Sequence, residues 1–139
     1  MNNWQTFAIA SAFWAGLTAI LGKVGVSEIN SNFATFIRTV VILVVSAAIV
    51  TFRQEWVKPD AVPTRSLVFL VLSGIATGLS WLCYYRALQL GPASKVAPVD
   101  KLSIVFVIIL SLCFLGETFS WKVFLGTALI VAGSLVIAS

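Results

Sequence analysis

Residues 84–117, YYRALQLGPASKVAPVDKLSIVFVIILSLCFLGE, decide the fold. No charged side chain lies between Lys101 and Glu117, yet Asp100 and Lys101 stand directly before this apolar run. A helix over residues 93–115, at 1.5 Å per residue, is long enough to cross a hydrocarbon layer of about 30 Å. We therefore predict that the segment crosses a membrane and carries Asp100 and Lys101 past the Gly-Pro turn into the bilayer.

The composition supports the same interpretation for the rest of the chain. Of its 139 residues, 60% are hydrophobic and only 10% are charged, whereas about a quarter of the residues in a soluble domain are charged. Such a chain cannot cover an apolar core with a polar surface, and a lipid bilayer is the solvent that suits it. The sequence predicts an integral membrane protein.

Other apolar segments also have membrane-spanning length. We place five spans near residues 4–22, 32–52, 66–88, 93–115 and 121–138. They must be helical, because lipid offers no hydrogen-bond partner to backbone N–H and C=O groups. Asn30 or Ser31 is expected to cap the second span, and Ser120 the last. The predicted fold is an all-α integral membrane protein with five transmembrane helices, which form a single membrane domain over residues 1–139.

The residue types present disfavour several classes of function. The chain has no histidine, so a zinc site and a serine–histidine nucleophile both lack essential groups. The two cysteines, Cys83 and Cys113, lie inside apolar segments, where cysteine behaves as a small hydrophobe. The net charge of +4 comes from basic residues scattered singly, which is not the footprint of nucleic-acid binding. We expect no enzyme activity, metal, cofactor or nucleic-acid partner.

The loops give only a weak signal for orientation. An odd number of spans puts the termini on opposite sides, and the side richer in loop Lys and Arg normally faces the cytoplasm. The N-terminal side has Arg53, Lys58, Arg65 and Lys122; the other has Lys23, Arg86 and Lys95, and gains Arg38 and Lys101 if these snorkel to it. Because the counts nearly cancel, two outcomes stay open. The chain inserts in one orientation, or it inserts in both and allows an antiparallel pair.

Asp100 is the first candidate for a functional side chain. It lies about 12 Å along the fourth span at 1.5 Å per residue. An ionised side chain costs about 2.5–3.5 kcal/mol at the bilayer centre and less near the interface. On an unbroken helix Lys101 would point about 100° away from Asp100, so a partner from another helix, another subunit or water is expected. The alternative is an interfacial carboxylate that caps a helix or pairs with Arg86 or Arg38.

Three basic side chains and a proline are further candidates. Lys101 either faces a cavity or snorkels to the headgroups on its long stem. Arg86 is either an interfacial anchor or a partner of Asp100, and Arg38, two turns into the second span, either snorkels or pairs inside the bundle. Pro98 removes a backbone donor from the fourth span, and broken helices often form the binding sites of transporters.

One face of the third span combines small and aromatic residues. Gly74, Gly78, Trp81 and Tyr85 follow one another at i, i+4, i+7 and i+11, so they share a face. The two glycines suit close helix contacts. The two rings either pack in the ordinary way or form a pocket wall that can hold a cation.

Two other spans add candidates. Trp14 lies far from both ends of the first span and is a third residue suited to a pocket wall. Gly126 and Gly133 share a face of the last span. This face predicts a packing surface, either within the chain or between subunits.

The order of these features resembles a known family. The run YYRALQLGPASKVAPVDKLSIVFVIILSLCFLGETFSWKVFLGTALIVAGSLVIA looks like the end of an EamA-type repeat of the drug/metabolite transporter superfamily. The matching features are the aromatic–Arg–Ala–Leu end of a span, the GPAS turn, the proline-bearing helix closed by GE, and the AG of the last span. Upstream, FWAGLTAILGK and NFATFIRT resemble the first and second spans of such a repeat. The chain is most similar to the five-span bacterial/archaeal transporters, in which VDKLS is a characteristic stretch.

This resemblance implies one half of an inverted-repeat transporter, because most EamA transporters contain two such repeats. A complete pathway then needs two chains, so the resemblance implies a homodimer, antiparallel if both orientations insert, with a central cavity for a small-molecule substrate. The expected function is a multi-pass transporter of the inner (plasma) membrane that moves a small metabolite or amphipathic compound by alternating access. The expected site contains Asp100 as the ligand or proton-coupling carboxylate, Lys101 and Arg86 as its electrostatic partners, and Trp14, Trp81 and Tyr85 as walls. The alternative is a non-transporting membrane subunit that packs with a larger membrane partner.

An antiparallel homodimer predicts that both orientations coexist in the membrane. Fusions of a compartment-specific reporter to either terminus should then give a signal on both sides, because the basic loop residues are nearly balanced. Reporter activity confined to one side would exclude dual topology.

Overall fold

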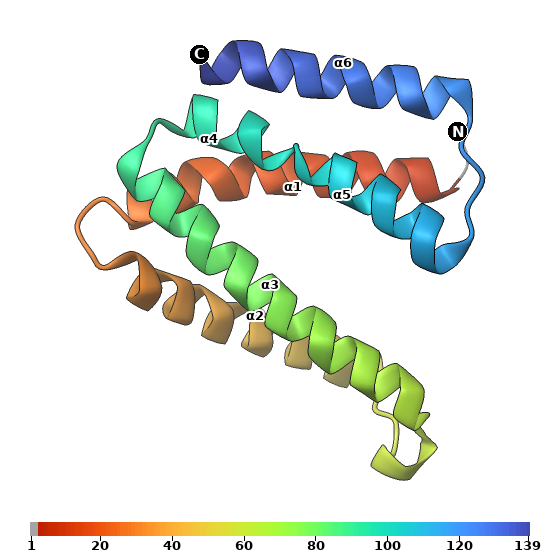
Figure 1. The fold of residues 1–139 in the computed structure, drawn as a ribbon. Coiled ribbons are helices and arrows are strands. Elements are labelled where there is room, and N and C mark those ends of the chain that lie inside the picture. Colours follow the sequence, from red (N-terminus) through yellow and green to blue (C-terminus); the bar gives the residue numbers. More distant parts are fainter. Residues whose placement is uncertain (1–2) are drawn as a thin grey trace. The chain divides into compact units, whose positions relative to one another are not determined.

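The computed structural model describes residues 3–139, which form helices joined by short connections (Figure 1). The elements in chain order are α1 (Asn3–Gly25), α2 (Ser31–Phe52), the 3₁₀ turn η1 (Pro59–Ala61), α3 (Thr64–Leu90), α4 (Ala93–Asp100), α5 (Ser103–Leu110), the π-helical turn η2 (Ser111–Leu115) and α6 (Trp121–Ala138). No strand occurs within residues 3–139. Five segments are long and apolar enough to cross a membrane, with α4, α5 and η2 together making the fourth. The predicted all-α fold with five spans is confirmed.

Two helices extend beyond the spans expected from the sequence. The first continues to Gly25 and not only to residue 22, and the third runs from Thr64 to Leu90 and not only over residues 66–88. Hydropathy locates the part of a helix that matches the hydrocarbon layer, whereas the helix itself can continue into the interface.

Side-chain caps fix the starts of two spans. The Asn30 side chain accepts a hydrogen bond from the backbone N–H of Asn32 at 2.9 Å, so Asn30 is the N-cap of α2. The Ser120 hydroxyl accepts from the backbone N–H of Val123 at 3.3 Å, which confirms the expected cap of α6. Each cap provides a partner for a backbone donor that the first helical turn leaves unpaired.

The fourth span has the expected bounds, residues 93–115, but its helix is interrupted, as Pro98 suggested. Lys101 and Leu102 form a turn between α4 and α5. Here the hydrogen bonds join residues three apart: the Lys101 N–H donates to Pro98 O at 3.0 Å, and the Ile104 N–H to Lys101 O at 3.1 Å. Pro98 has no N–H to donate to the carbonyl of Ser94, so the α-helical ladder already lacks one bond before the turn.

Two compact units divide the chain. The first contains residues 1–23 and 90–139, and the second contains residues 24–89. Within the first unit, α4 packs against α6. The Lys23 ammonium donates to the Gly91 carbonyl at 2.8 Å, which ties α1 to the turn before α4.

In the second unit, the last turn of α3 holds the connection between α1 and α2. The Gln89 amide nitrogen donates to the carbonyl of Ile29 at 3.0 Å and to that of Val26 at 3.3 Å. The amide oxygen of Gln89 accepts from the Arg86 guanidinium at 2.8 Å. Val26 and Leu88 are fully buried. One amide side chain therefore satisfies two loop carbonyls and is itself oriented by an arginine.

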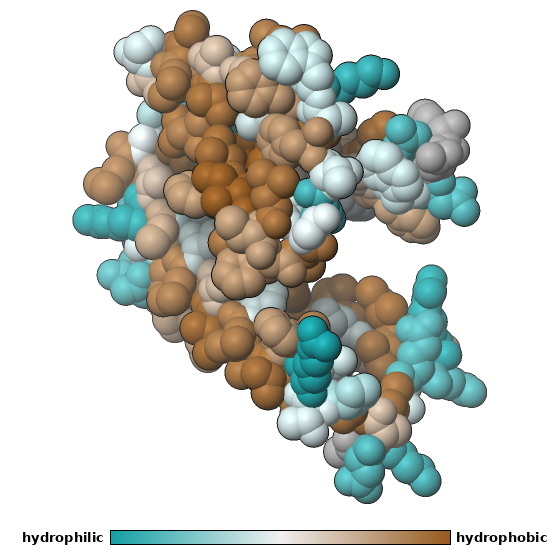
Figure 2. Space-filling view, turned by 45° about the vertical axis from the view of Figure 1, so that its right-hand side comes forward, coloured by the Kyte–Doolittle hydropathy of each residue, from teal (hydrophilic) through white to brown (hydrophobic). Residues whose placement is uncertain are grey.

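The surface of the helices suits lipid. Large apolar side chains are exposed on all five spans, for example Phe7, Leu43, Leu70, Phe106 and Val136. Figure 2 shows how much of the visible surface is apolar.

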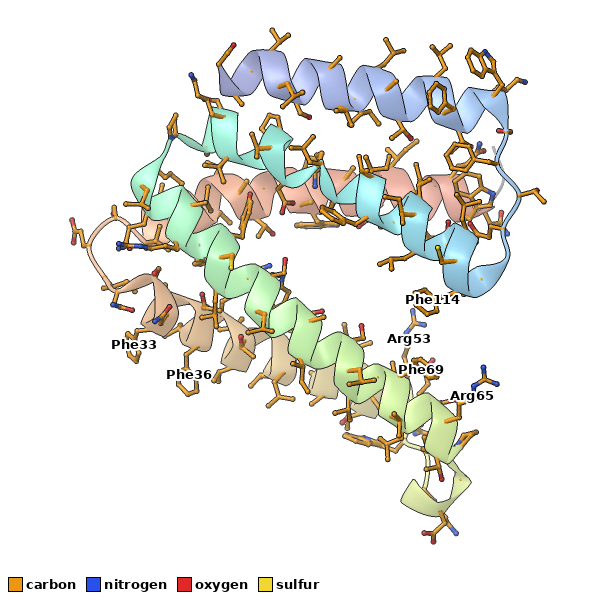
Figure 3. All side chains as sticks on the ribbon, in the orientation of Figure 1. Phe33, Phe36, Arg53, Arg65, Phe69 and Phe114 are labelled. Atoms are coloured by element: carbon orange, nitrogen blue, oxygen red, sulfur yellow. The ribbon has the colours of Figure 1, made fainter. Side chains whose placement is uncertain are left out.

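Basic side chains gather where α2 and α3 are joined. Arg53 follows α2 and Arg65 begins α3, so both lie at the same end of this helix pair (Figure 3). The Arg65 guanidinium lies 6.0 Å from the Phe69 ring, and the Trp56 indole N–H donates to the Thr51 hydroxyl at 3.1 Å. Arginine and tryptophan together are typical of the headgroup layer.

The Gln89 contacts generate a prediction about the connection between α1 and α2. Gln89→Leu should lower the free energy of unfolding by about 1 kcal/mol, because two exposed or part-buried hydrogen bonds are lost. It should also speed amide hydrogen exchange at residues 26–30 in detergent-purified protein. Gln89→Glu, which keeps the size but loses the donor, should have the same effect. Thr77→Val is the control, since the Thr77 hydroxyl bonds only within α3. Unchanged exchange in both Gln89 variants would contradict the prediction.

Candidate functional site

Arg38 lies against two aromatic rings in the second unit. Its guanidinium carbon is 4.1 Å from the centre of the Trp81 ring and 5.3 Å from that of Tyr85. Trp81 and Tyr85 stand one turn apart on α3, so both rings can reach the same group on α2. Tyr85 is buried, whereas Arg38 and Trp81 are half-buried. We call Arg38, Trp81 and Tyr85 the aromatic–arginine cluster.

This cluster bears on two alternatives that the sequence left open. The shared face of Trp81 and Tyr85 does hold a cation, but the cation is the side chain of Arg38. Arg38 is not paired with a carboxylate among the described residues of this unit. Its guanidinium lies on the rings instead, which stabilise its charge; this is a third arrangement beside snorkelling and pairing.

Asp100 and Lys101 form an ion pair in the first unit. The Lys101 ammonium lies 3.7 Å from a carboxylate oxygen of Asp100, and the two side chains are 60% and 41% exposed. The expectation that adjacent side chains would point apart is wrong here. It assumed an unbroken helix, whereas α4 ends at Asp100 and Lys101 belongs to the turn. The turn therefore gives Asp100 a partner on its own segment.

The remaining candidate side chains have local partners. Arg86 is exposed, and its guanidinium donates to Gln89. Trp14 is exposed on α1, with its ring 5.5 Å from that of Phe13 in an edge-on arrangement. The candidates thus fall into two groups, with Asp100, Lys101 and Trp14 in the first unit and Arg38, Trp81, Tyr85 and Arg86 in the second.

The candidate packing glycines face open space. A Cβ atom added to Gly74, Gly78, Gly126 or Gly133 would meet no other atom within 4 Å. Among the described residues of their own units, these glycines make no close contact with another helix. A packing role between subunits stays a prediction.

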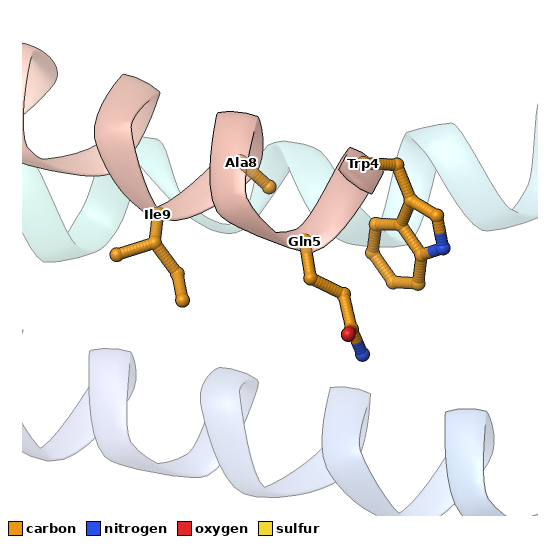
Figure 4. A pocket seen from close by; sticks show the side chains of 4 residues that line it. All are labelled: Trp4, Gln5, Ala8 and Ile9. Carbon is orange, nitrogen blue, oxygen red and sulfur yellow. The ribbon is translucent and has the colours of Figure 1, made fainter. Parts of the chain in front are cut away.

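A shallow hollow of about 280 Å³ lies on the first turns of α1, apart from all these candidates. It is lined by Trp4, Gln5, Ala8 and Ile9 (Figure 4). Its lining is mostly apolar and contains no charged side chain, so it offers no specific recognition chemistry.

Two structural polar residues were not singled out from the sequence. Gln89 and Lys23 both hydrogen-bond to backbone carbonyls of loops distant in sequence. Each stands near the end of an apolar span, beside glycine or a Gly-Pro turn. A polar side chain at that position, next to a loop whose carbonyls lack partners, is the signal that could have identified them.

Comparison with known proteins identifies the class. The EamA-like transporter family matches residues 2–139, and the chain belongs to this family. It is therefore a multi-pass membrane protein of a transporter family, located in the inner (plasma) membrane, as the resemblance in the sequence predicted.

Two relatives extend this comparison. The chain is 57% identical over 137 residues to an uncharacterized transporter in the cobO 3' region of a Sinorhizobium species, covering 99% of this chain and 97% of that protein. It is 30% identical over 135 residues to the probable 4-amino-4-deoxy-L-arabinose-phosphoundecaprenol flippase subunit ArnF of Proteus mirabilis (strain HI4320), covering 96% and 90%. No solved structure matches the chain.

The broken fourth span generates a prediction about Pro98. Pro98→Ala restores an N–H that can donate to the carbonyl of Ser94, so the helix should extend further toward Leu102. Amide hydrogen exchange at residues 101–105 should slow in detergent-purified protein. Pro63→Ala, placed just before α3, is the control and should leave these amides unchanged. Equal exchange in the Pro98 variant and the wild type would mean that the proline does not cause the break.

Proposed function

We propose that this chain is a secondary transporter that moves a small metabolite or amphipathic compound by alternating access. The observation that carries the proposal is the break in the fourth span, where an acidic and a basic side chain stand directly before an uncharged run from Leu102 to Leu115. A charge in a span is costly unless it serves a pathway or has a partner. Broken helices supply both polar groups and free backbone at the substrate sites of transporters.

Asp100 is the proposed ligand or proton-coupling carboxylate. In the structure its charge is balanced by Lys101 at 3.7 Å, a loose pair that a substrate or a proton can displace. Protonation of Asp100 would release Lys101 and change the charge at the turn. Because the turn already interrupts the helix, α4 and α5 can reorient there without first breaking a continuous ladder. Trp14, which belongs to the same unit, is proposed as a wall.

Two chains are proposed to form the complete pathway. The chain matches one family domain over residues 2–139 and has five spans, so a homodimer would supply both halves of an inverted repeat. The open faces of Gly126 and Gly133 on α6 offer a surface for a second copy. The relative from Proteus mirabilis is named for a lipid-linked amino sugar, which supports an amphipathic substrate here.

A non-transporting subunit is the second candidate. The same relative is named a flippase subunit, which favours a chain that acts beside another protein. In that case the ion pair of Asp100 and Lys101 would only stabilise the turn between α4 and α5. A second protein that co-purifies in stoichiometric amount would support this candidate.

The proposed coupling role predicts the effect of Asp100→Asn. A thermal-shift screen of metabolites and amphiphiles first identifies a ligand, because a compound that binds the folded state raises its stability. Flux of that ligand into proteoliposomes is then measured at several pH values. Asp100→Asn should abolish the pH-dependent component, because the amide cannot bind or release the proton, while dimerisation stays intact.

Asp60→Asn is the matched control for this experiment. It makes the same chemical change in η1, outside the spans, and should leave flux unchanged. Coupled flux that persists in Asp100→Asn would remove Asp100 from the mechanism.

A further inference from the structure

The guanidinium of Arg38 has unused hydrogen-bonding capacity. Stacking on Trp81 and Tyr85 engages the face of the guanidinium, whereas its N–H groups point outward in its plane. Among the described residues of the second unit, no hydrogen bond or ion pair satisfies those N–H groups. The acidic side chains of this unit are Glu28, Glu55 and Asp60, and Glu55 is paired with Arg53 at 3.7 Å.

The position of Arg38 in the span makes the lack of an acceptor for its N–H groups unusual. It lies seven residues after Ser31, about 10 Å along α2 at 1.5 Å per residue, and the span around it is apolar. An arginine at depth normally pairs with a carboxylate, a backbone carbonyl or water. Here the two rings hold the charge in place but provide no acceptor in the plane of the guanidinium.

There is also open space on the ring-bearing face of α3. Gly78 stands one turn before Trp81 on that face, and a Cβ atom there would meet nothing within 4 Å. This face of α3 is therefore open at Gly78. A planar guanidinium with free N–H groups, held on the rings of a face that is open at Gly78, matches the two oxygens of a phosphate or carboxylate.

We propose that the aromatic–arginine cluster binds the oxyanion of an amphipathic substrate, with Arg38 as the donor and Trp81 and Tyr85 as its support. This deepens the proposed function, on which it rests, by assigning the substrate a negatively charged head group. An alkyl chain attached to the oxyanion would contact the exposed apolar side chains of the span. The oxyanion belongs either to a lipid-like molecule or to a free anion in solution, and the experiment separates the two.

The test uses the full chain in phosphatidylcholine nanodiscs and isothermal titration calorimetry, with empty nanodiscs as the blank. The probes are octyl phosphate and inorganic phosphate. Wild-type protein should bind octyl phosphate, and Arg38→Gln should weaken binding by about tenfold or more, because a charged hydrogen bond is lost. Binding of octyl phosphate alone supports a lipid-like source, and equal binding of inorganic phosphate supports a soluble anion.

Two further variants keep the result interpretable. Arg38→Lys preserves the charge, so weaker binding by this variant is not explained by an uncharged side chain that disturbs folding. It should bind octyl phosphate more weakly than the wild type, because lysine lacks the planar guanidinium. Arg65→Gln is the matched control, since Arg65 also lies near a ring, that of Phe69 at 6.0 Å, but is exposed beside the loop. It should bind octyl phosphate as the wild type does.

The outcomes separate this inference from the proposed transport function. The inference is overturned if wild-type protein binds neither probe, or if both Arg38 variants bind as tightly as the wild type. Asp60→Asn should retain octyl phosphate binding, because Asp60 lies in η1, outside the spans. Binding that depends on Arg38 in a protein without flux would support the oxyanion site and reject transport by this chain alone.

Discussion

Lipid offers no hydrogen-bond partner to the peptide group, and the rest of this structure depends on that constraint. It forces every span into a helix and leaves apolar side chains free to cover the outside. The break at Lys101 and Leu102 respects the same constraint, because bonds between residues three apart replace part of the α-helical ladder. This turn, where the backbone of the fourth span departs from an α-helix, is thus also the place where an acid and a base meet.

The chain stabilises charge within its spans in two different ways. Asp100 is balanced by the neighbouring Lys101, which leaves the fourth span electrically neutral at that point. Arg38 is supported by the rings of Trp81 and Tyr85, which stabilise its position without removing its charge. A neutral pair can exchange partners, whereas a ring-supported cation keeps its attraction for an anion. Under the proposed function, the two groups would therefore suit different parts of a transport cycle.

The features predicted correctly from the sequence depend on length and local pattern. The spans follow from apolar runs, and the cap at Ser120 from a hydroxyl directly before such a run. The position of the break could not be predicted from the sequence. Pro98 weakens the hydrogen-bond ladder of the helix, but the turn itself begins three residues later, at Lys101. The contact of Arg38 with Trp81 was also beyond a single-sequence analysis, since it depends on how α2 and α3 lie against each other. Periodicity identified the ring-bearing face but not the group that occupies it.

The Gln89 contacts have a consequence for biogenesis. They join residues 63 and 60 positions apart, from the end of α3 back to Val26 and Ile29. A ribosome therefore releases this connecting loop long before its partner exists. The loop must remain without these bonds while the second and third spans leave the translocation channel. The connection between α1 and α2 can form these bonds only after three spans have entered the membrane, so its early topology is set by the lipid and the insertion machinery and not by its final contacts.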